Sequence, residues 1–314
     1  MALSSPASIG GGTARSITSG ITKKGSDIRS KVIEIVLVLS LALSLLILLI
    51  LIVDLARRSS PVWTDRGWGF ITDGLNSKSA QKAGIGQAIR GTVMLAMIVL
   101  VVALPLGIAC AVYLEEYGGS SRFAAFTRLN VRNLAGVPSI VYGLLGLAIF
   151  VKALDGLTKG RTVISGGLAL SALVLPIVII TASEAIRAVP RSIREGAFGV
   201  GATPWETVRS HVLPSAAPGI LTGSVLALAR AAGEAAPVLL VGAVTGLLRT
   251  GEQGVIDQIT GRFTALPVAI FSYARQPGDD FRAVTAAASV ALLVVVLLMN
   301  SFAIWLRNRY ERKW

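Results

Sequence analysis

The 314-residue chain contains very little cysteine, histidine or charge. Its one cysteine, Cys110, excludes an internal disulfide, and its one histidine, His211, has no second imidazole or thiolate with which to bind a metal. Charged residues make up 15% of the chain and hydrophobic residues 53%, whereas a soluble domain carries about 25% charged residues. This composition excludes a disulfide scaffold and an ordinary soluble domain, predicts no metal site, and indicates an integral membrane protein.

Acidic residues are also scarce, because 17 Asp and Glu face 30 Lys and Arg and leave a formal net charge of +13. A nucleic-acid-binding protein gathers such charge on one face. Here the basic residues stand in short runs between apolar stretches. This pattern is typical of loops at a membrane surface, so we expect the lipid bilayer, and no nucleic acid, as a partner.

Six stretches are long and apolar enough to span a bilayer, which takes roughly 20 helical residues. They cover residues 32–53, 88–113, 131–154, 166–188, 216–244 and 284–306. The sequence therefore predicts an all-α, polytopic membrane protein whose six transmembrane helices lie within residues 32–306. The middle four stretches carry Gly, Pro, Ser, Tyr and charges, so we expect the function to reside in them.

The two ends of the chain are polar or basic. Residues 1–31 are rich in Ser, Gly and Thr and predict a disordered tail, whereas residues 307–314 form a basic tail. Asp54, Arg57 and Arg58 follow the first stretch in place of a small-residue cleavage site, so we expect an uncleaved helix. An even number of helices and basic tails predict a multi-pass protein of the cell (inner) membrane with both termini in the cytoplasm.

Residues 190–214 are too polar to span a membrane but contain a full set of helix signals. Gly201 is placed to end a first short helix in the left-handed conformation. Thr203, Pro204 and Glu206 then supply an N-cap, a first-turn proline and a capping-box glutamate. The segment predicts two short helices at an angle, with Pro214 returning the chain to the fifth stretch.

This segment resembles the cytoplasmic loop of ABC importer permeases, in which Glu-Ala-Ala, three residues, Gly, nine residues and Ile-x-Leu-Pro follow one another. The matching residues here are Glu195, Gly196, Ala197, Gly201, Leu213 and Pro214. Gly196 replaces the alanine and His211 the isoleucine, and Gly196 loosens the helix by about 1 kcal/mol at most. The resemblance implies that these residues couple the chain to a partner ATPase.

Further stretches within residues 85–306 resemble the PstA family of phosphate-specific ABC permeases. They are Tyr113-Leu114-Glu115-Glu116-Tyr117, Asn133 to Gly143, Arg187-Ala188-Val189-Pro190, Leu226 to Pro237 and Leu266-Pro267-Val268. The resemblance implies an importer with a related second permease (PstC-like), two copies of a cytoplasmic ATPase (PstB-like) and an extracytoplasmic phosphate-binding protein (PstS-like). No phosphate-binding loop of the form G-x-x-x-x-G-K-[ST] occurs in the sequence. We therefore expect a non-enzymatic permease subunit that binds no cofactor, with ATP and Mg on the partner ATPase.

Arg230 lies near the middle of the predicted fifth helix, where a lone arginine costs about 2.5–3.5 kcal/mol on insertion scales. Glu234 follows one turn later and offers an ion pair. The pair either ties the helix to a neighbour or marks an anion pathway, and we favour the pathway; in the PstA family the matching arginine is tied to transport. Ser139 and Tyr142 follow Pro138, which we expect to kink the helix. Their hydroxyl groups either donate hydrogen bonds to a passing oxyanion or are satisfied within the kinked helix itself.

Three further expectations concern contacts. Gly219 and Gly223 begin a small-residue stripe that serves either an internal contact or, as we slightly favour, the contact with the second permease. Glu184 and Arg187 predict a weak ion pair at the membrane interface. The outer loop 246–281 is assigned to docking of the binding protein, through amphipathic segments at 255–259 and 266–271.

Three other functions remain possible on the sequence alone. The nearest is the same machine with another substrate, such as molybdate or an organic solute. A secondary transporter would need a coupling-ion site and commonly shows internal repeats, and no convincing repeat is present. A membrane hydrolase is remote, because the predicted helices contain no histidine and no serine stands in a recognisable nucleophile motif.

Overall fold

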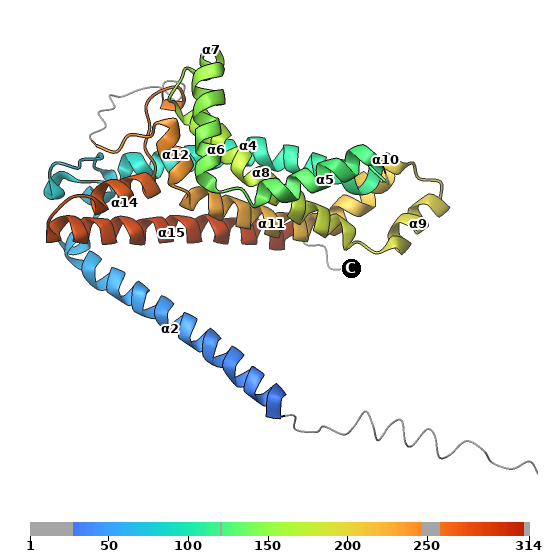
Figure 1. Cartoon of the computed structure of the whole chain (residues 1–314), viewed down its shortest axis with the longest axis horizontal. Helices are drawn as coiled ribbons and strands as arrows, with labels where there is room; N and C mark the ends of the chain where they lie inside the picture. Colours follow the sequence, from blue (N-terminus) through green and yellow to red (C-terminus); the bar gives the residue numbers. More distant parts are fainter. Residues whose placement is uncertain (1–27, 120, 247–257, 311–314) are drawn as a thin grey trace, which may run out of the picture. The chain divides into compact units, whose positions relative to one another are not determined.

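The computed structural model describes residues 28–119, 121–246 and 258–310, which form helices and short connections with no β-strand among them. The contacts divide the chain into two units, residues 1–54 and 55–314, and the helix Ile28–Asp65 (α2) runs across the boundary. Figure 1 shows the other elements. They are α3 (Trp68–Thr72), the 3₁₀-helix η1 (Ala80–Lys82), α4 (Gly86–Val112), the π-helix η2 (Tyr113–Tyr117), α5 (Arg122–Ala135), α6 (Ser139–Gly146), the π-helix η3 (Leu147–Ala153), α7 (Asp155–Thr158), α8 (Val163–Arg187), α9 (Arg191–Gly199), α10 (Pro204–Thr207), the π-helix η4 (Val208–Val212), α11 (Leu213–Gly233), α12 (Ala236–Val241), α14 (Leu266–Ala274) and α15 (Asp279–Tyr310).

The described part of the first unit, residues 28–54, belongs to one apolar helix. Its two serines satisfy their hydroxyl groups within the helix, because Ser40 donates to the carbonyl of Val36 at 2.8 Å and Ser44 to that of Leu41 at 2.9 Å. Such internal hydrogen bonds are what a helix in lipid requires. Most of the tail predicted at residues 1–31 lies outside the described residues, and residues 28–31 are the first turn of α2.

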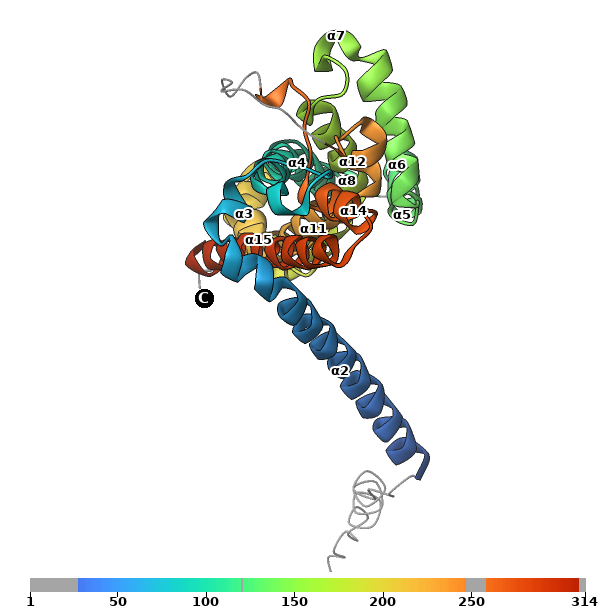
Figure 2. The same cartoon turned by 90° about the vertical axis from the view of Figure 1, so that its left-hand side faces the viewer.

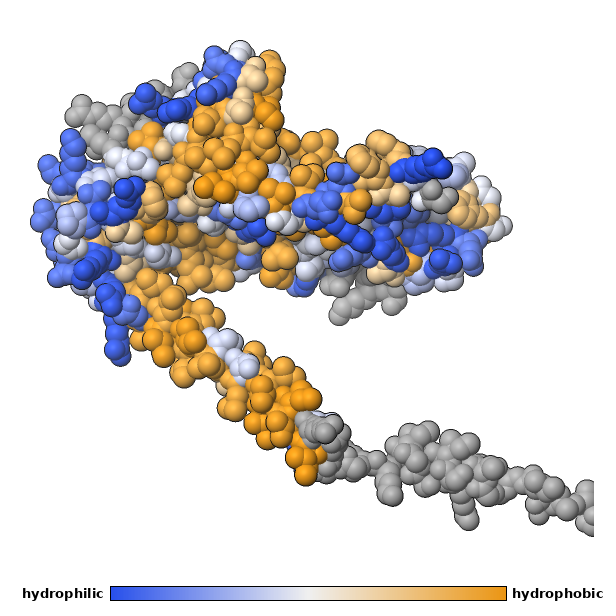
Figure 3. All heavy atoms as spheres, in the orientation of Figure 1, coloured by the Kyte–Doolittle hydropathy of each residue, from blue (hydrophilic) through white to orange (hydrophobic). Residues whose placement is uncertain are grey.

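The second unit is built on long helices that lie side by side. α4 packs along α8, α8 along α11, and α11 along α15, and both ribbon views show this bundle (Figures 1 and 2). Its main core joins α4, α8 and α11 through buried side chains that include Val99, Leu173 and Ala227. In this unit, exposed apolar side chains cover the middle of the bundle while polar residues gather towards its two ends (Figure 3).

The predicted six-helix membrane fold is confirmed. Within the described residues, five helices are long and apolar enough to cross a bilayer, and a bent pair of helices brings the number to six. The five are residues 30–65, 86–117, 163–187, 204–233 and 279–309. Three of them extend beyond the stretches predicted at 32–53, 88–113 and 284–306, because polar residues continue the helices past the apolar core.

The third predicted helix is not one straight span. Residues 131–135 belong to α5, and α5 and the α6–η3 helix meet at 104°. The chain turns at Gly136 and Pro138, and Pro138 is the N-cap of α6 with extended ψ of 139°. Because proline lacks an N–H group, it starts a helix more readily than it continues one.

The fifth predicted helix begins earlier and ends earlier than expected. It runs from Pro204 to Gly233 through α10, η4 and α11, instead of over 216–244. Pro214 stands in the first turn of α11, directly after the π-helix η4, and the helix continues through it, so it does not separate a second short helix from the span. The predicted angle therefore lies only between α9 and α10.

One end of the second unit is closed by short segments. The guanidinium of Arg66 donates to the carbonyls of Ala80 and Ala83, at 3.0 and 2.6 Å, and thereby holds η1 against the end of α2. The segment at 266–271, which we expected to lie on a membrane or partner, is instead part of α14. Most of its side chains, including Leu266 and Val268, are buried in the core. Residues 255–257 of the other amphipathic segment lie outside the described residues.

Candidate functional site

Arg230 and Glu234 form the ion pair expected from their spacing. Nε of Arg230 lies 3.4 Å from Oε1 of Glu234, and the side chains are 46% and 20% exposed. Arg230 is not in the middle of a helix as predicted, because α11 ends three residues later. It stands in the last turn, where the negative end of the helix dipole favours a cation.

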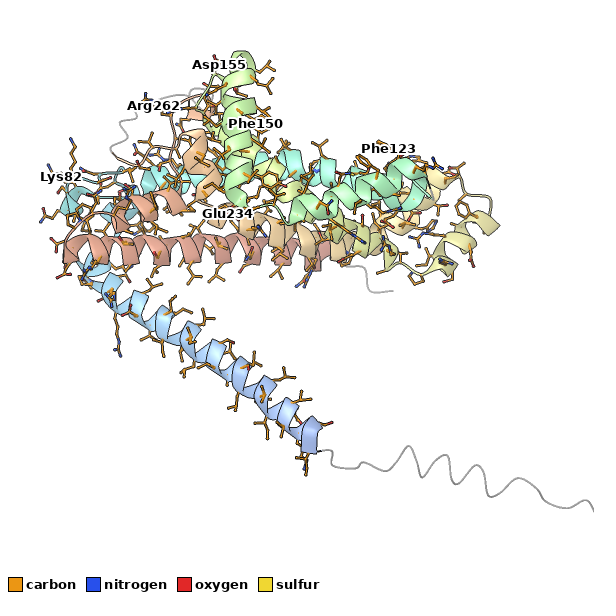
Figure 4. All side chains as sticks on the ribbon, in the orientation of Figure 1. Lys82, Phe123, Phe150, Asp155, Glu234 and Arg262 are labelled. Atoms are coloured by element: carbon orange, nitrogen blue, oxygen red, sulfur yellow. The ribbon has the colours of Figure 1, made fainter. Side chains whose placement is uncertain are left out.

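The helix ends at Gly233 for a local reason. Glu234 is in extended conformation, with φ −82° and ψ 117°, and α12 begins at Ala236 with Pro237 in its first turn. Glycine and proline disfavour the helix interior, so the sequence places a break between two apolar segments. Figure 4 labels Glu234 at this break inside the second unit. An irregular backbone inside a membrane protein is tolerated where protein or a water-filled cavity surrounds it.

Two more predicted pathway residues lie on α6, which packs against α12. Tyr142 is 6% exposed, and its hydroxyl donates to the carbonyl of Leu134 at 2.8 Å across the α5–α6 bend. Tyr142 belongs to the same buried cluster as Ala227 and Ala231 of α11, the helix that carries Arg230. Ser139 is half-buried in the first turn of α6, one turn before Tyr142. The structure thus brings Arg230, Glu234 and Tyr142 into one region, with Tyr142 also securing the bend.

Residues 190–214, which the loop resemblance predicts to couple the chain to an ATPase and which we call the coupling element, contain α9 near their start. The expected left-handed residue is present, since Gly201 has φ +86° and nothing lies within 4 Å of the Cβ that a larger residue would add there. The expected capping box is present as well. Glu206 accepts a hydrogen bond from the Thr203 N–H at 2.8 Å, and the Glu206 N–H donates to the Thr203 hydroxyl at 3.3 Å.

Large apolar side chains are exposed on the coupling element. Phe198 is 51% exposed, Val200 85% and Trp205 56%. Exposed aromatic residues on a polar loop mark a protein contact more often than a solvent face. Glu195 is also exposed on α9. These residues form one accessible tip around Gly201.

A groove of about 530 Å³ separates α9 from the start of α11. Its lining includes Gly196 and Ala197 from the start of the loop motif and Pro214 from its end, so the groove brings the two ends of the motif together. Leu213 is half-buried beside it. His211, which replaces the motif isoleucine, lines the same groove and is exposed.

The small-residue stripe on α11 makes an internal contact, which corrects our slight preference for the second permease. A Cβ on Gly219 would lie 2.7 Å from Cβ of Ala185, and a Cβ on Gly223 would overlap Thr181. Both neighbours belong to α8. The stripe therefore lets α8 and α11 of the same chain approach closely.

Sequence reasoning missed the network around two adjacent carboxylates at the end of α4. We expected Arg187 to pair with Glu184. Instead, Arg187 donates to the Glu115 carboxylate from Nη2 at 2.9 Å and from Nε at 3.2 Å. Arg194 binds Glu116 with its closest nitrogen at 2.7 Å. Two carboxylates at the end of an apolar helix are costly unless they are paired, and this signal was available in the sequence.

The comparisons with known proteins agree on one family. Residues 103–314 match the family described as "Binding-protein-dependent transport system inner membrane component". The chain is 35% identical to the phosphate transport system permease protein PstA of Xylella fastidiosa (strain 9a5c), over 73% of this chain and 77% of that protein. It is 31% identical to the phosphate transport system permease protein PstA 1 of Mycobacterium tuberculosis (strain H37Rv), over 77% of this chain and 78% of that protein.

Solved structures share the fold at low sequence identity. A bacterial alginate ABC transporter, in complex with an alginate-bound periplasmic protein, superimposes with a TM-score of 0.63 at 17% identity, over 88% of this chain and 93% of that one. The MetNI methionine ABC transporter in an inward-facing conformation superimposes with a TM-score of 0.53 at 17% identity, over 73% and 95%. These likenesses concern the fold alone.

Proposed function

Because this chain belongs to the family of binding-protein-dependent transport system inner membrane components, we propose that it is the permease subunit of an ATP-driven importer of inorganic phosphate. Phosphate is proposed as the substrate because the chain is similar to named phosphate permeases, with 31–35% identity over about three quarters of its length. A second permease completes the pathway.

In this proposal Arg230 supplies the positive charge of an anion pathway. An arginine within an apolar helix is expensive, yet nearly half of its side chain is exposed, and among the described residues only the Glu234 carboxylate forms an ion pair with it. In a site of low dielectric, a single charge attracts an oxyanion strongly. Glu234 orients the guanidinium, and Ser139 in the first turn of α6 offers its hydroxyl to a passing anion, whereas the Tyr142 hydroxyl stays bound to the Leu134 carbonyl and secures the bend beside it.

The coupling element moves this site. Residues 204–233 are one continuous helix with Trp205 near one end and Arg230 near the other. At 1.5 Å per residue, a helix of this length spans about 45 Å. A displacement of the exposed tip by the ATPase therefore reaches the arginine through a rigid rod, and alternating access follows as the helices of the two permeases rock.

The partners follow from the same proposal. Two copies of a cytoplasmic ATPase hold ATP and Mg and contact Glu195, Phe198 and Gly201 at the tip. An extracytoplasmic binding protein delivers phosphate to the opposite end. Both termini and residues 190–214 lie in the cytoplasm.

Transport by the purified complex tests the proposal. The chain is co-expressed with a second permease and an ATPase encoded beside it, reconstituted in vesicles and supplied with the binding protein encoded there. We expect ATP-dependent accumulation of ³²P-phosphate that excess unlabelled phosphate abolishes and that equal concentrations of molybdate or sulfate leave nearly unchanged. Accumulation of labelled molybdate in place of phosphate would contradict the proposed substrate.

A further inference from the structure

The π-helix η2, which directly continues α4, carries two neighbouring carboxylates whose side chains are largely withdrawn from solvent. Glu115 is 10% exposed and Glu116 is 11% exposed. Desolvated carboxylates are stable only when cations and hydrogen-bond donors surround them. The π-helix η2, which contains both residues, widens the turn at this point, and such insertions recur at functional sites.

Arg194 connects Glu116 to the coupling element. On α9, Arg194 donates to Oε1 of Glu116 from Nη2 at 2.7 Å and from Nε at 3.2 Å. It also donates to the carbonyl of Ile186 at 2.9 Å and to that of Val189 at 2.7 Å. One guanidinium thus joins the end of α4, the end of α8 and the chain between α8 and α9. A bidentate arginine–carboxylate pair fixes distance and angle together.

Glu115 makes a comparable pair that does not reach the coupling element. Arg187 on α8 binds Glu115 with both nitrogens, and Nε of Arg128 on α5 lies 3.8 Å from the same carboxylate. All three residues belong to membrane helices or their ends. The Arg187–Glu115 pair therefore has the same chemistry as Arg194–Glu116. It connects helices of the bundle with one another and includes no residue of α9.

The chain leaves helical geometry on both sides of α9, so neither link continues a neighbouring helix into it. Pro190 precedes the helix in extended conformation, with ψ 140°, and Gly201 follows it in the left-handed region. Its exposed face carries Phe198, which is 51% exposed. A force applied there would pivot α9 about its ends unless another contact carried the force into the bundle.

α4 also leads to the region of Glu234, the ion-pair partner of Arg230. Thr92, near the other end of α4, lines a small internal cavity together with Glu234. The hydroxyl of Thr92 accepts a hydrogen bond from the Leu266 N–H at 2.9 Å, which fixes this part of α4 to α14. A movement of α4 therefore acts on the surroundings of Glu234 through the part of the cavity wall that Thr92 contributes.

We propose that Arg194 and Glu116 are positioning residues that carry ATPase-driven movement from α9 into α4, as a second mechanical connection beside the continuous helix 204–233. The inference rests on the proposed function, since it presumes that an ATPase contacts α9. It assigns the two residues no contact with phosphate or ATP. Their loss uncouples hydrolysis from transport while the complex still assembles.

The experiment compares Glu116→Gln and Arg194→Lys with the matched variants Glu115→Gln and Arg187→Lys in the reconstituted complex. Binding of the ATPase, basal hydrolysis, stimulation by the loaded binding protein and phosphate transported per ATP are measured together. For Glu116→Gln and Arg194→Lys we expect normal assembly and basal hydrolysis, with transport per ATP reduced about tenfold, a usual size of coupling between sites. For the Glu115 and Arg187 variants we expect the wild-type ratio of transport to hydrolysis.

A distance measurement gives a readout that does not depend on the substrate. Spin labels at positions 200 and 117, which are exposed, report whether α9 and α4 move together when ATP is trapped. We expect an unchanged distance in the otherwise wild-type chain and an ATP-dependent change with Glu116→Gln. An unchanged distance and a wild-type transport ratio in Glu116→Gln would overturn the proposed link. If instead the wild-type complex hydrolyses ATP but transports no phosphate, the substrate assignment is wrong. The distance measurement then still tests whether Arg194 and Glu116 connect α9 with α4.

Discussion

Arg230 and Glu234 are joined across the end of a helix, since Arg230 belongs to the last turn of α11 and Glu234 is the first residue beyond its end. The pair therefore bridges a helical and an extended segment, 3.4 Å from nitrogen to oxygen. A pair within one continuous helix would be rigid. This one lies at the break after Gly233 that separates the helical segments α11 and α12.

Arg230→Gln is expected to lower phosphate uptake at least about tenfold while the complex assembles normally. Glutamine keeps hydrogen-bond donors but removes the charge that attracts an anion, and one tenfold change corresponds to about 1.4 kcal/mol. Uptake of ³²P-phosphate, normalised to the amount of assembled complex, measures the effect.

The double variant Arg230→Gln, Glu234→Gln separates the pathway from a purely structural pair. If the arginine only neutralised Glu234, removal of both charges would restore uptake. We expect no recovery. Rescue by the double variant would reject the pathway role, and Glu234→Gln alone serves as the matched control for loss of the carboxylate.

Gly201→Asp is expected to weaken docking of the ATPase more than folding of the chain. The left-handed backbone costs a residue with Cβ roughly 1–2 kcal/mol, and nothing nearby collides with the new atom. Gly201→Ala imposes the same backbone strain without charge and is the control. Co-purification of the ATPase and hydrolysis stimulated by the binding protein are the measurements, and wild-type values for the aspartate variant would exclude docking at this tip.

The proposed topology predicts which introduced cysteines an impermeant thiol reagent reaches in intact spheroplasts. In a Cys110→Ser background we expect labelling at Lys82→Cys, on the closed end of the second unit, and none at Val200→Cys or Asn308→Cys until the cells are lysed. All three positions are exposed. Labelling of position 200 or 308 without lysis would reverse the orientation.

The sequence predicted the elements that depend on local signals and missed those that depend on distant partners. The capping box at Thr203 and the left-handed Gly201 follow from neighbouring residues, and both are present. The partners of Arg187 and Arg194 lie 72 and 78 residues away, so spacing within one helix could not identify them.

Helix ends were predicted less well than helix existence. The hydropathy pattern predicted that the fifth helix runs through Glu234, because the residues on both sides are apolar. In the structure α11 ends at Gly233, and α12 begins next to Pro237. The same reasoning merged the end of α5 with α6 across Gly136 and Pro138. Glycine and proline therefore outweigh an apolar run when both occur within a few residues.

Tyr273 is expected to hold the closed end of the second unit together below pH 10. It is fully buried, its hydroxyl donates to the carbonyl of Gly84 at 2.6 Å, and burial raises the pKa of Tyr273 to about 12. Tyr273→Phe leaves that carbonyl without this donor and should lower the free energy of unfolding by about 1–3 kcal/mol. Thermal unfolding of the purified complex measures the loss, and Tyr117→Phe, at an exposed tyrosine, is the matched control.

The raised pKa also fixes the direction of the pH dependence at Tyr273. Between about pH 10 and pH 12 an unfolded tyrosine ionises while the buried one does not, so the unfolded state gains stability and the folded state loses up to about 3 kcal/mol relative to it. Below pH 10 this contribution is constant. Spectrophotometric titration should therefore show one tyrosine that ionises after the others and that is absent from Tyr273→Phe. Ionisation of every tyrosine near pH 10 in the folded complex would mean that the Tyr273 hydroxyl is accessible to water and does not bind the Gly84 carbonyl.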